Sequence, residues 1–112
     1  MAFMMSLEDL KLILMGLKWM TMRKISDKHK IGGVYQVKLN LFDEYSFKVR
    51  ILDKLLVNLD EMDEAEFNGI GYDKSSYLSH PYNINNPSSQ RVKYVFEIVE
   101  INEARLKELN LL

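Results

Sequence analysis

The sequence predicts a small α+β domain built around a mostly antiparallel β-barrel, with an N-terminal helix, short helices after the middle strands and a C-terminal helix. Two patterns predict it. One stretch near the start has apolar residues at helical spacing, and three later stretches alternate apolar and polar residues as half-buried strands do. A chain of 112 residues is the size of one domain with a single modest core. We therefore expect residues 1–112 to fold as one unit.

The first helix is predicted over residues 6–17. Ser6 followed by Asp9 resembles a capping box, with Asp in place of the more usual Glu or Gln. Gly16 weakens the last turn and lets the chain leave the helix. Five apolar residues of this stretch fall on one helical stripe that we expect to be buried: Leu7, Leu10, Ile13, Leu14 and Leu17.

Three strands are predicted, over residues 34–41, 46–52 and 91–101. In the first two, apolar residues alternate with polar or basic ones, so each strand has one face toward the core. The residues between them fit a hairpin connection. The third strand is the longest and has apolar residues on both faces, as expected of a central strand. Such a sheet leaves few strand edges open when it curls into a barrel.

Shorter helices are expected between and after these strands. Asp60 is placed to cap a short acidic helix, and residues 73–80 to add a helical turn. Residues 80–90 are rich in Asn, Ser and Pro, which predicts a loop. Asn102 is expected to cap the C-terminal helix, whose leucines would pack on the barrel or against a second subunit.

The composition excludes several kinds of chemistry. The chain has no cysteine, so disulfides, thiolate metal sites and cysteine nucleophiles are excluded. His29 and His80 lie far apart in sequence and are expected at the surface, so we expect no metal site, and no cofactor is suggested. Charged residues interrupt the apolar groups among the first 20 positions, unlike a signal peptide or membrane span. A cytoplasmic protein with no membrane partner is expected.

Positive charge is concentrated in the first half of the chain. Residues 1–54 carry ten Lys or Arg against six Asp or Glu, whereas residues 55–112 carry five against ten. The densest basic segment is residues 18–30, which would attract an anion such as phosphate if the fold keeps it on one surface. The alternative is a solvated loop with ordinary lysines. The cations of this segment are Lys18, Arg23, Lys24, Lys28 and Lys30.

Residues 19–25 are expected to be extended. Met20 and Met22 would then fill the core, while Trp19, Thr21 and Arg23 would share the other face as a stacking and phosphate-binding set. Lys18 has the opposite parity and joins this set only if the chain turns after Gly16. In the alternative interpretation Trp19 is a core residue that seals the helix against the sheet.

The stretch "ILMGLKWMTMRK", residues 13–24, resembles the signature that opens an ASCH domain, a family within the PUA-like superfamily of small β-barrels. Three further stretches resemble later parts of that family: "KIGGVYQVKLN", "KVRILDKLLVNLDEMDEAEFNGI" and "VKYVFEIVEI". Together the similarity covers about residues 7–101. The resemblance implies a PUA-like barrel that binds or processes RNA.

One branch of the ASCH family consists of small amidohydrolases that remove the acetyl group from acetylated cytidine. The resemblance places the lysine and the nucleophilic threonine of that branch on Lys18 and Thr21. A hydroxyl needs such a base or cation nearby to become a useful nucleophile. The glutamate of that branch falls on Asn68, which cannot accept a proton, and Glu66 two residues away is the candidate substitute. The sequence therefore leaves open whether the protein is an enzyme.

Two functions follow from these observations. In the first, the protein binds RNA or a nucleotide in a basic cleft beside the first helix. The residues expected to contact that ligand are Trp19, Arg23, Lys24, Lys28 and Lys30. In the alternative, the protein deacetylates nucleosides of the N4-acetylcytidine type with Lys18, Thr21 and Glu66. Lys18 and Thr21 can also be structural parts of the turn, with Thr21 bonded to the backbone.

Overall fold

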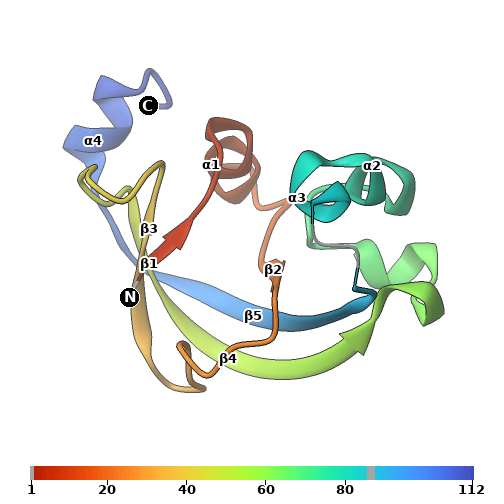
Figure 1. The fold of residues 1–112 in the computed structure, drawn as a ribbon. Coiled ribbons are helices and arrows are strands. Elements are labelled where there is room, and N and C mark those ends of the chain that lie inside the picture. Colours follow the sequence, from red (N-terminus) through yellow and green to blue (C-terminus); the bar gives the residue numbers. More distant parts are fainter. Residues whose placement is uncertain (1, 86–87) are drawn as a thin grey trace.

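The computed structural model describes residues 2–85 and 88–112, which form an α+β fold with one mixed sheet of five strands in the order β1-β3-β4-β5-β2 (Figure 1). The strands are β1 (Ala2–Met4), β2 (Met20–Arg23), β3 (Val34–Lys38), β4 (Phe47–Asn58) and β5 (Gln90–Ile101). The helices are α1 (Leu7–Leu14), α2 (Lys74–Ser79), α3 (Pro81–Ile84) and α4 (Glu103–Glu108), with 3-10 turns η1 (Leu59–Glu61) and η2 (Glu64–Phe67).

Helix α1 begins at the predicted capping box. The Asp9 backbone N–H donates to Ser6 Oγ at 3.1 Å, and the Ser6 N–H donates to Asp9 Oδ2 at 3.2 Å. The helix ends at Leu14, three residues before the predicted end, and Gly16 then takes a φ of +73°, which glycine adopts without strain. Because the helix stops early, Leu17 is exposed.

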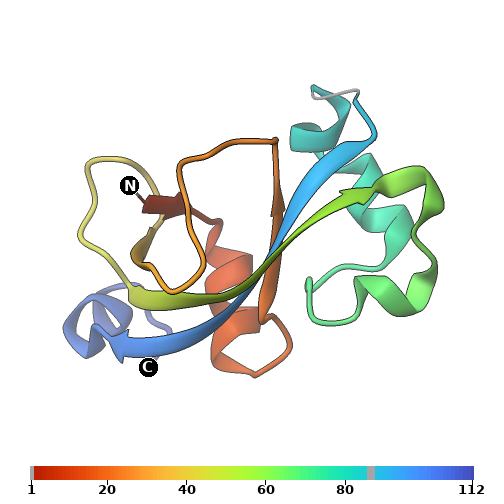
Figure 2. The same ribbon diagram turned by 90° about the horizontal axis from the view of Figure 1, so that it is seen from below.

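Strands β4 and β5 form a long antiparallel ribbon that curves beneath the helices in Figure 1 and runs diagonally across the molecule when seen from below (Figure 2). Strand β4 extends well beyond the predicted end at residue 52. A register shift between Ile51 and Asp53 disturbs the alternation there, and pairing continues to Asn58. The β-bulge therefore interrupts the alternation of apolar and polar residues, but the strand continues beyond it.

The predicted closed barrel is wrong, because the sheet is open. Strand β1 pairs only with β3, in parallel, and β2 pairs only with β5, so β1 and β2 are the two edges. The sequence prediction missed β1, in which Phe3 is buried against the core and Met4 is exposed. The edge strands have three and four residues, and edges this short do not require closure.

The connections differ from the predicted ones in two places. The acidic segment forms two separate 3-10 turns, capped by Asn58 and Asp63, in place of one helix capped by Asp60. Part of the predicted loop over residues 80–90 is helix α3, and residues 86–87 of that loop lie outside the described residues. The predicted helical turn after Asp73 and the cap at Asn102 are confirmed as α2 and α4.

The buried hydrophobic residues form two separate clusters. The first packs α1 and α4 on the sheet and includes Phe3, Leu10, Ile13, Val37, Phe47, Tyr94 and Leu106. The second packs η1, η2 and α2 and comprises Met22, Leu59, Met62, Phe67, Ile70 and Tyr77. Leu106 is fully buried, and Leu109 and Leu111 pack against the same cluster, so these C-terminal leucines cover the protein's own sheet.

Candidate ligand-binding site

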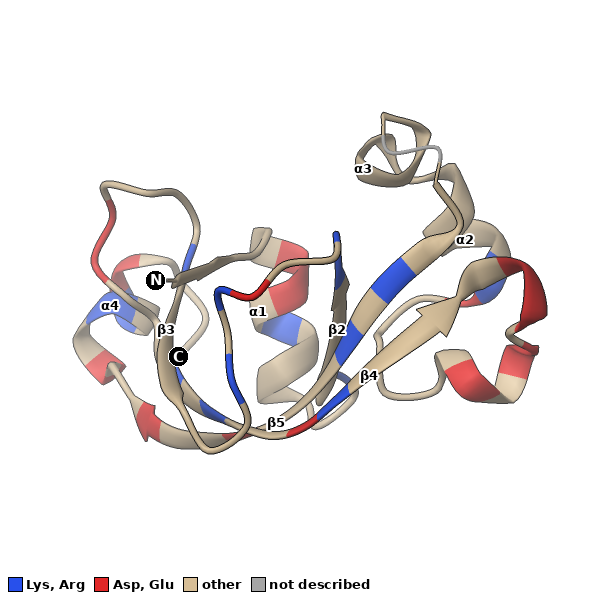
Figure 3. Ribbon diagram, turned by 60° about the horizontal axis from the view of Figure 1, so that its bottom comes forward, with Lys and Arg blue, Asp and Glu red and all other residues tan. Residues whose placement is uncertain are grey.

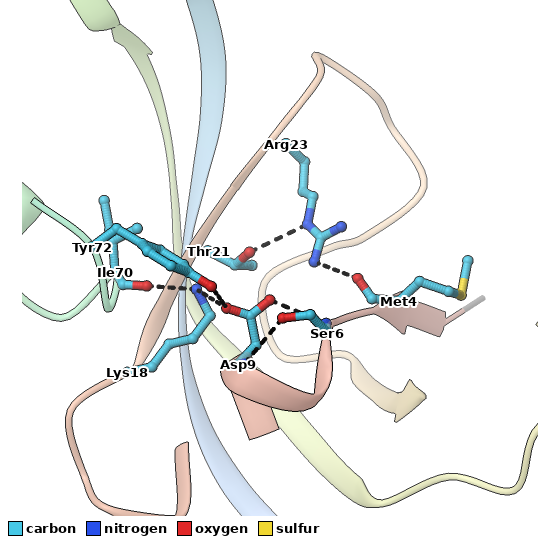
Figure 4. Close-up of polar contacts among 8 residues, drawn as sticks. All are labelled: Met4, Ser6, Asp9, Lys18, Thr21, Arg23, Ile70 and Tyr72. Atoms are coloured by element: carbon cyan, nitrogen blue, oxygen red, sulfur yellow. Dashed lines mark hydrogen bonds and ion pairs between the residues drawn. The ribbon is translucent and has the colours of Figure 1, made fainter. Parts of the chain in front are cut away.

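A cavity of about 170 Å³ lies between the start of α1, strand β2 and the segment that leads into α2 and α3. Pockets for drug-sized ligands have volumes of about 300–1,000 Å³, so this cavity suits a smaller group such as one ring system. Figure 4 shows six of its polar side chains, which converge from the start of α1, from β2 with the turn before it, and from the segment before α2: Ser6, Asp9, Lys18, Thr21, Arg23 and Tyr72.

Lys18 reaches the cavity because the chain turns at Gly16 before β2 begins. Its side chain is buried, and Nζ donates to the Ile70 carbonyl at 2.7 Å and lies 3.9 Å from Asp9 Oδ1. Burial lowers the pKa of Lys18 from 10.5 to about 8, although the Asp9 charge opposes this and the Arg23 charge adds to it. Lys18 can therefore exchange a proton close to neutral pH.

Asp9 and Tyr72 form the second part of the polar cluster. The Tyr72 hydroxyl donates to Asp9 Oδ1 at 3.0 Å, from a position 63 residues later in the chain. Burial raises the pKa of Tyr72, and the negative charge of Asp9 raises it further. The hydroxyl therefore stays protonated over the physiological pH range and donates a hydrogen bond to Asp9.

Thr21 and Arg23 leave β2 on the same face and are joined by a hydrogen bond. Arg23 Nε donates to Thr21 Oγ1 at 3.2 Å, and Arg23 Nη2 donates to the Met4 carbonyl at 3.0 Å. The guanidinium lies 5.5 Å from the centre of the Phe3 ring, and its burial lowers the pKa of Arg23. Among the described residues, no carboxylate lies within 4.0 Å of it.

Three further ring side chains and Asn83 also line the cavity. Tyr77 comes from α2, Tyr82 from α3, and His80 from the junction between the two helices. The Lys24 backbone N–H donates to the Tyr82 hydroxyl at 2.9 Å, which ties α3 to the chain after β2. The cavity therefore combines rings with two cations and one carboxylate.

Trp19 lies outside this cavity. Strand β2 starts at Met20, so Trp19 precedes the regular alternation that was predicted to place it beside Thr21. The backbone N–H of Trp19 donates to the Gly69 carbonyl at 2.8 Å. The indole covers Gly69 so closely that a Cβ there would lie 2.4 Å from Cε2 of the ring. With 40% of its surface exposed, Trp19 is neither a cavity residue nor a fully buried one.

The remaining predicted cations lie in the loop of residues 24–33. Lys24, Lys28 and Lys30 are exposed, and none lines the cavity. Lys28 and Lys30 contact Ser26 and Tyr35 only through their backbone N–H groups. Figure 3 shows this basic loop apart from the acidic turns η1 and η2. The same loop contains His29, which is buried and stacked on Phe3 at 3.9 Å between ring centres, so the prediction of a surface residue is wrong.

Glu66 is exposed on η2 and does not line the cavity, and Asn68 is exposed beside a different groove. Asp9 is the carboxylate that reaches the cavity, and the sequence prediction used it only as a helix-capping residue. Its partners lie nine and 63 residues away, so no local pattern joins them. The short Asp at a position usually taken by Glu or Gln is the one local signal.

Among the described residues, no three His, Asp or Glu side chains are grouped to hold a metal ion. No helix in residues 2–85 and 88–112 has the length and apolar character needed to cross a membrane. Comparisons of the chain with protein-family models, curated proteins and solved structures found no match. The resemblance to the ASCH family stays a prediction from the sequence motifs.

Proposed function

We propose that the protein binds a nucleotide, free or within single-stranded RNA, and that the base or sugar enters the cavity beside α1. The observation that supports this most is the cavity lining, in which aromatic rings and charged hydrogen-bonding groups border the same small volume. Unpaired bases are recognised by stacking on aromatic rings and by hydrogen bonds along their edges. Both kinds of contact are available here within one small volume.

The polar groups offer a mixed set of donors and acceptors. Lys18 Nζ donates, and the Asp9 carboxylate accepts, so a base edge with both an acceptor and a donor is matched. Arg23 uses Nε and one N–H of Nη2 for contacts within the protein. Its other edge, formed by Nη1 and the second N–H of Nη2, suits the two oxygens of a phosphate.

The exposed lysines contribute in a different way. Lys24 follows β2 directly and lies close to Tyr82 at the cavity wall, whereas Lys28 and Lys30 lie further along the loop. We expect Lys28 and Lys30 to attract RNA through long-range charge and not to contact a bound mononucleotide. Trp19 is expected to contribute no stacking inside the cavity.

The test is a titration followed by NMR with the four ribonucleosides, their 5′-monophosphates and a short single-stranded RNA, at low and high salt. We expect saturable shifts of the Thr21 and Tyr72 signals. Arg23→Gln should weaken monophosphate binding about tenfold, the size of one lost charged contact of about 1.4 kcal/mol. The matched controls Lys28→Gln and Lys30→Gln should weaken only RNA binding, and mainly at low salt. Saturable shifts confined to the loop of residues 24–33 would contradict the proposal.

A second candidate function is hydrolysis of an acyl group from a nucleoside, and one observation favours it. Lys18, with a pKa of about 8, lines the same cavity as the buried Thr21 hydroxyl. Neutral Lys18 would take the hydroxyl proton while the oxygen attacks the acyl carbon and forms an ester. The proton then passes to the departing amine, and water hydrolyses the ester. Arg23 would stabilise the negative oxygen of the intermediate.

The hydrolase candidate is tested with N4-acetylcytidine by measuring released acetate and cytidine. Thr21→Ala should abolish release while cytidine still binds, because the methyl group keeps the wall of the cavity. Saturable binding of N4-acetylcytidine without release would reject hydrolysis and leave binding as the function.

A further inference from the structure

Asp9 uses its two carboxylate oxygens for two separate tasks. Oδ2 accepts from the Ser6 N–H and completes the capping box of α1. Oδ1 accepts from the Tyr72 hydroxyl at 3.0 Å and lies 3.9 Å from Lys18 Nζ. Figure 4 shows the carboxylate between Ser6 on one side and Lys18 and Tyr72 on the other. Oδ2 therefore caps the helix, and Oδ1 contacts the polar groups of the cavity.

We propose that Asp9 is the positioning residue of this site: it orients the Lys18 ammonium and the Tyr72 hydroxyl at the cavity and keeps Lys18 positively charged there. The inference deepens the proposed function, since it assigns the group that sets the charge of the binding site. Asp9 also gives the cavity a carboxylate, whereas Glu66 lies outside the cavity and Asn68 has none.

Lys18 needs such a partner because its surroundings disfavour a charge. The side chain is buried, and Nζ donates a hydrogen bond to the Ile70 carbonyl, which carries no net charge. An ammonium held away from water is costly unless a counter-charge lies near. Within the described part of the chain, Asp9 is the only carboxylate within 4.0 Å of Lys18.

The other groups that face Lys18 do not replace this charge. Arg23 on β2 is a cation and opposes the protonation of Lys18. Tyr72 precedes α2 and donates to Asp9, and the wall formed by α2 and α3 contributes Tyr77, His80 and Tyr82. Asp9 on α1 is the anion of this set.

The capping box makes Asp9 a precise support. Asp9 is the third residue of α1, and two hydrogen bonds between it and Ser6 fix its backbone and side chain together. The carboxylate is therefore placed by local structure before any ligand arrives. A site whose supports are held this way loses little freedom when it binds.

The test measures the titration of Lys18 directly, by NMR of its ¹³Cε and ¹⁵Nζ nuclei in the free protein. Asp9→Asn keeps the size of the side chain and removes the charge, and should lower the pKa of Lys18 below its wild-type value. Glu8→Gln is the matched control, because it removes a neighbouring exposed charge in the same helical turn. It should leave the pKa of Lys18 unchanged.

Two further measurements test the same proposal: the pKa of Lys18 in the variant Asp9→Glu and the pH dependence of nucleotide affinity. Asp9→Glu restores the charge and should return the pKa of Lys18 most of the way. The pH at which nucleotide affinity falls by half should move down in Asp9→Asn and stay in place in Glu8→Gln. An equal pKa of Lys18 in Asp9→Asn and Glu8→Gln would overturn the proposal. Because Lys18 is titrated without ligand, a failure to bind nucleotides would count against the proposed function alone.

A measurement on the unaltered protein keeps the proposal testable if Asp9→Asn does not fold. The ¹³C signal of the Asp9 carboxylate should show a step at the pH where Lys18 titrates, because the two groups are 3.9 Å apart. A carboxylate signal that is flat through the Lys18 titration would overturn the assignment.

Discussion

Both halves of the basic segment carry Lys or Arg residues, but the structure places these cations differently. In residues 18–23, the Lys18 side chain is buried and the Arg23 side chain is partly buried, and both donate hydrogen bonds to backbone carbonyls, with a further one from Arg23 to Thr21. In residues 24–30, Lys24, Lys28 and Lys30 extend into solvent. The difference arises because β2 is fixed against β5 by strand pairing, whereas the following loop has no such pairing. A high density of positive charge in a sequence therefore does not by itself identify a binding surface. The course of the backbone determines which of the cations are buried and which are exposed.

The largest predicted effect is on the pH dependence of the free energy of unfolding, to which we expect Lys18 to contribute and the exposed lysines not to contribute. The pKa of Lys18 in the folded protein, about 8, lies below 10.5, so between these values the folded state binds fewer protons than the unfolded state. The free energy of unfolding should therefore rise with pH in this window, by up to about 3 kcal/mol for Lys18 alone. The difference between wild type and Lys18→Met, from urea unfolding at pH 7 to 9.5, isolates this contribution.

Lys28→Met is the matched control for that experiment, since it removes an exposed lysine from the other half of the segment. It should follow the wild-type pH dependence throughout. A parallel pH dependence in wild type and Lys18→Met would show that Lys18 titrates normally and would remove the contrast between the two halves.

The second prediction concerns Gly69, whose backbone packs against the Trp19 indole. Gly69 has a φ of +88°, and a Cβ there would clash with the indole, so Gly69→Ala should lower stability through both strain and overpacking. Gly32→Ala is the control, with a φ of +82° and nothing within 4 Å of the added atom. We expect Gly69→Ala to cost at least about 1 kcal/mol more than Gly32→Ala in thermal or urea unfolding. Equal losses would mean that the indole does not pack there.

His29 is the exception in the exposed half of the segment, and it gives the third prediction. Burial among Phe3, Tyr35 and Tyr94 lowers the pKa of His29, so the folded state binds fewer protons than the unfolded state below pH 6.5. Stability should be complete above the unfolded pKa and fall as the pH drops toward the folded one. His29→Phe should be less sensitive to pH between 6.5 and 5 in thermal unfolding, and an unchanged slope would place the ring in water.

The smallest effect is expected for the outward-facing lysines. The double variant Lys28→Gln, Lys30→Gln should change the free energy of unfolding by less than about 0.5 kcal/mol, because it alters surface positions with no side-chain partner among the described residues. The salt dependence of RNA affinity should become shallower, by at most about 1.4 in the log-log slope. A loss of folding stability would reveal a structural role for this loop.

The sequence patterns predicted most elements whose cause is local. The Ser6–Asp9 box, the strand at residues 91–101 and the cap at Asn102 all depend on neighbours in the chain, and all are present. Strand β1 was missed because three residues carry little periodicity, and with it the open sheet was missed. The acidic segment forms two short turns because Asn58 and Asp63 cap its two halves separately.

The candidate site divides in the same way. Lys18, Thr21 and Arg23 were selected from one stretch of sequence, and the structure brings all three to one cavity, although their function remains a proposal. Trp19 does not line the cavity because its indole packs against Gly69. Glu66 does not line it because it lies on the exposed turn η2. Asp9 and Tyr72 could not be paired from sequence, because 63 residues separate them and only the fold brings them together.

The most direct test of the proposed binding site is a titration of the free protein with the four nucleoside 5′-monophosphates, followed by NMR at 150 mM salt. Saturable shifts at Thr21, Lys18 and Tyr72, with Lys28 and Lys30 unmoved, are the predicted result. Shifts confined to Lys28 and Lys30, or no saturable shift with any of the four, would contradict the assignment of the cavity as a nucleotide site.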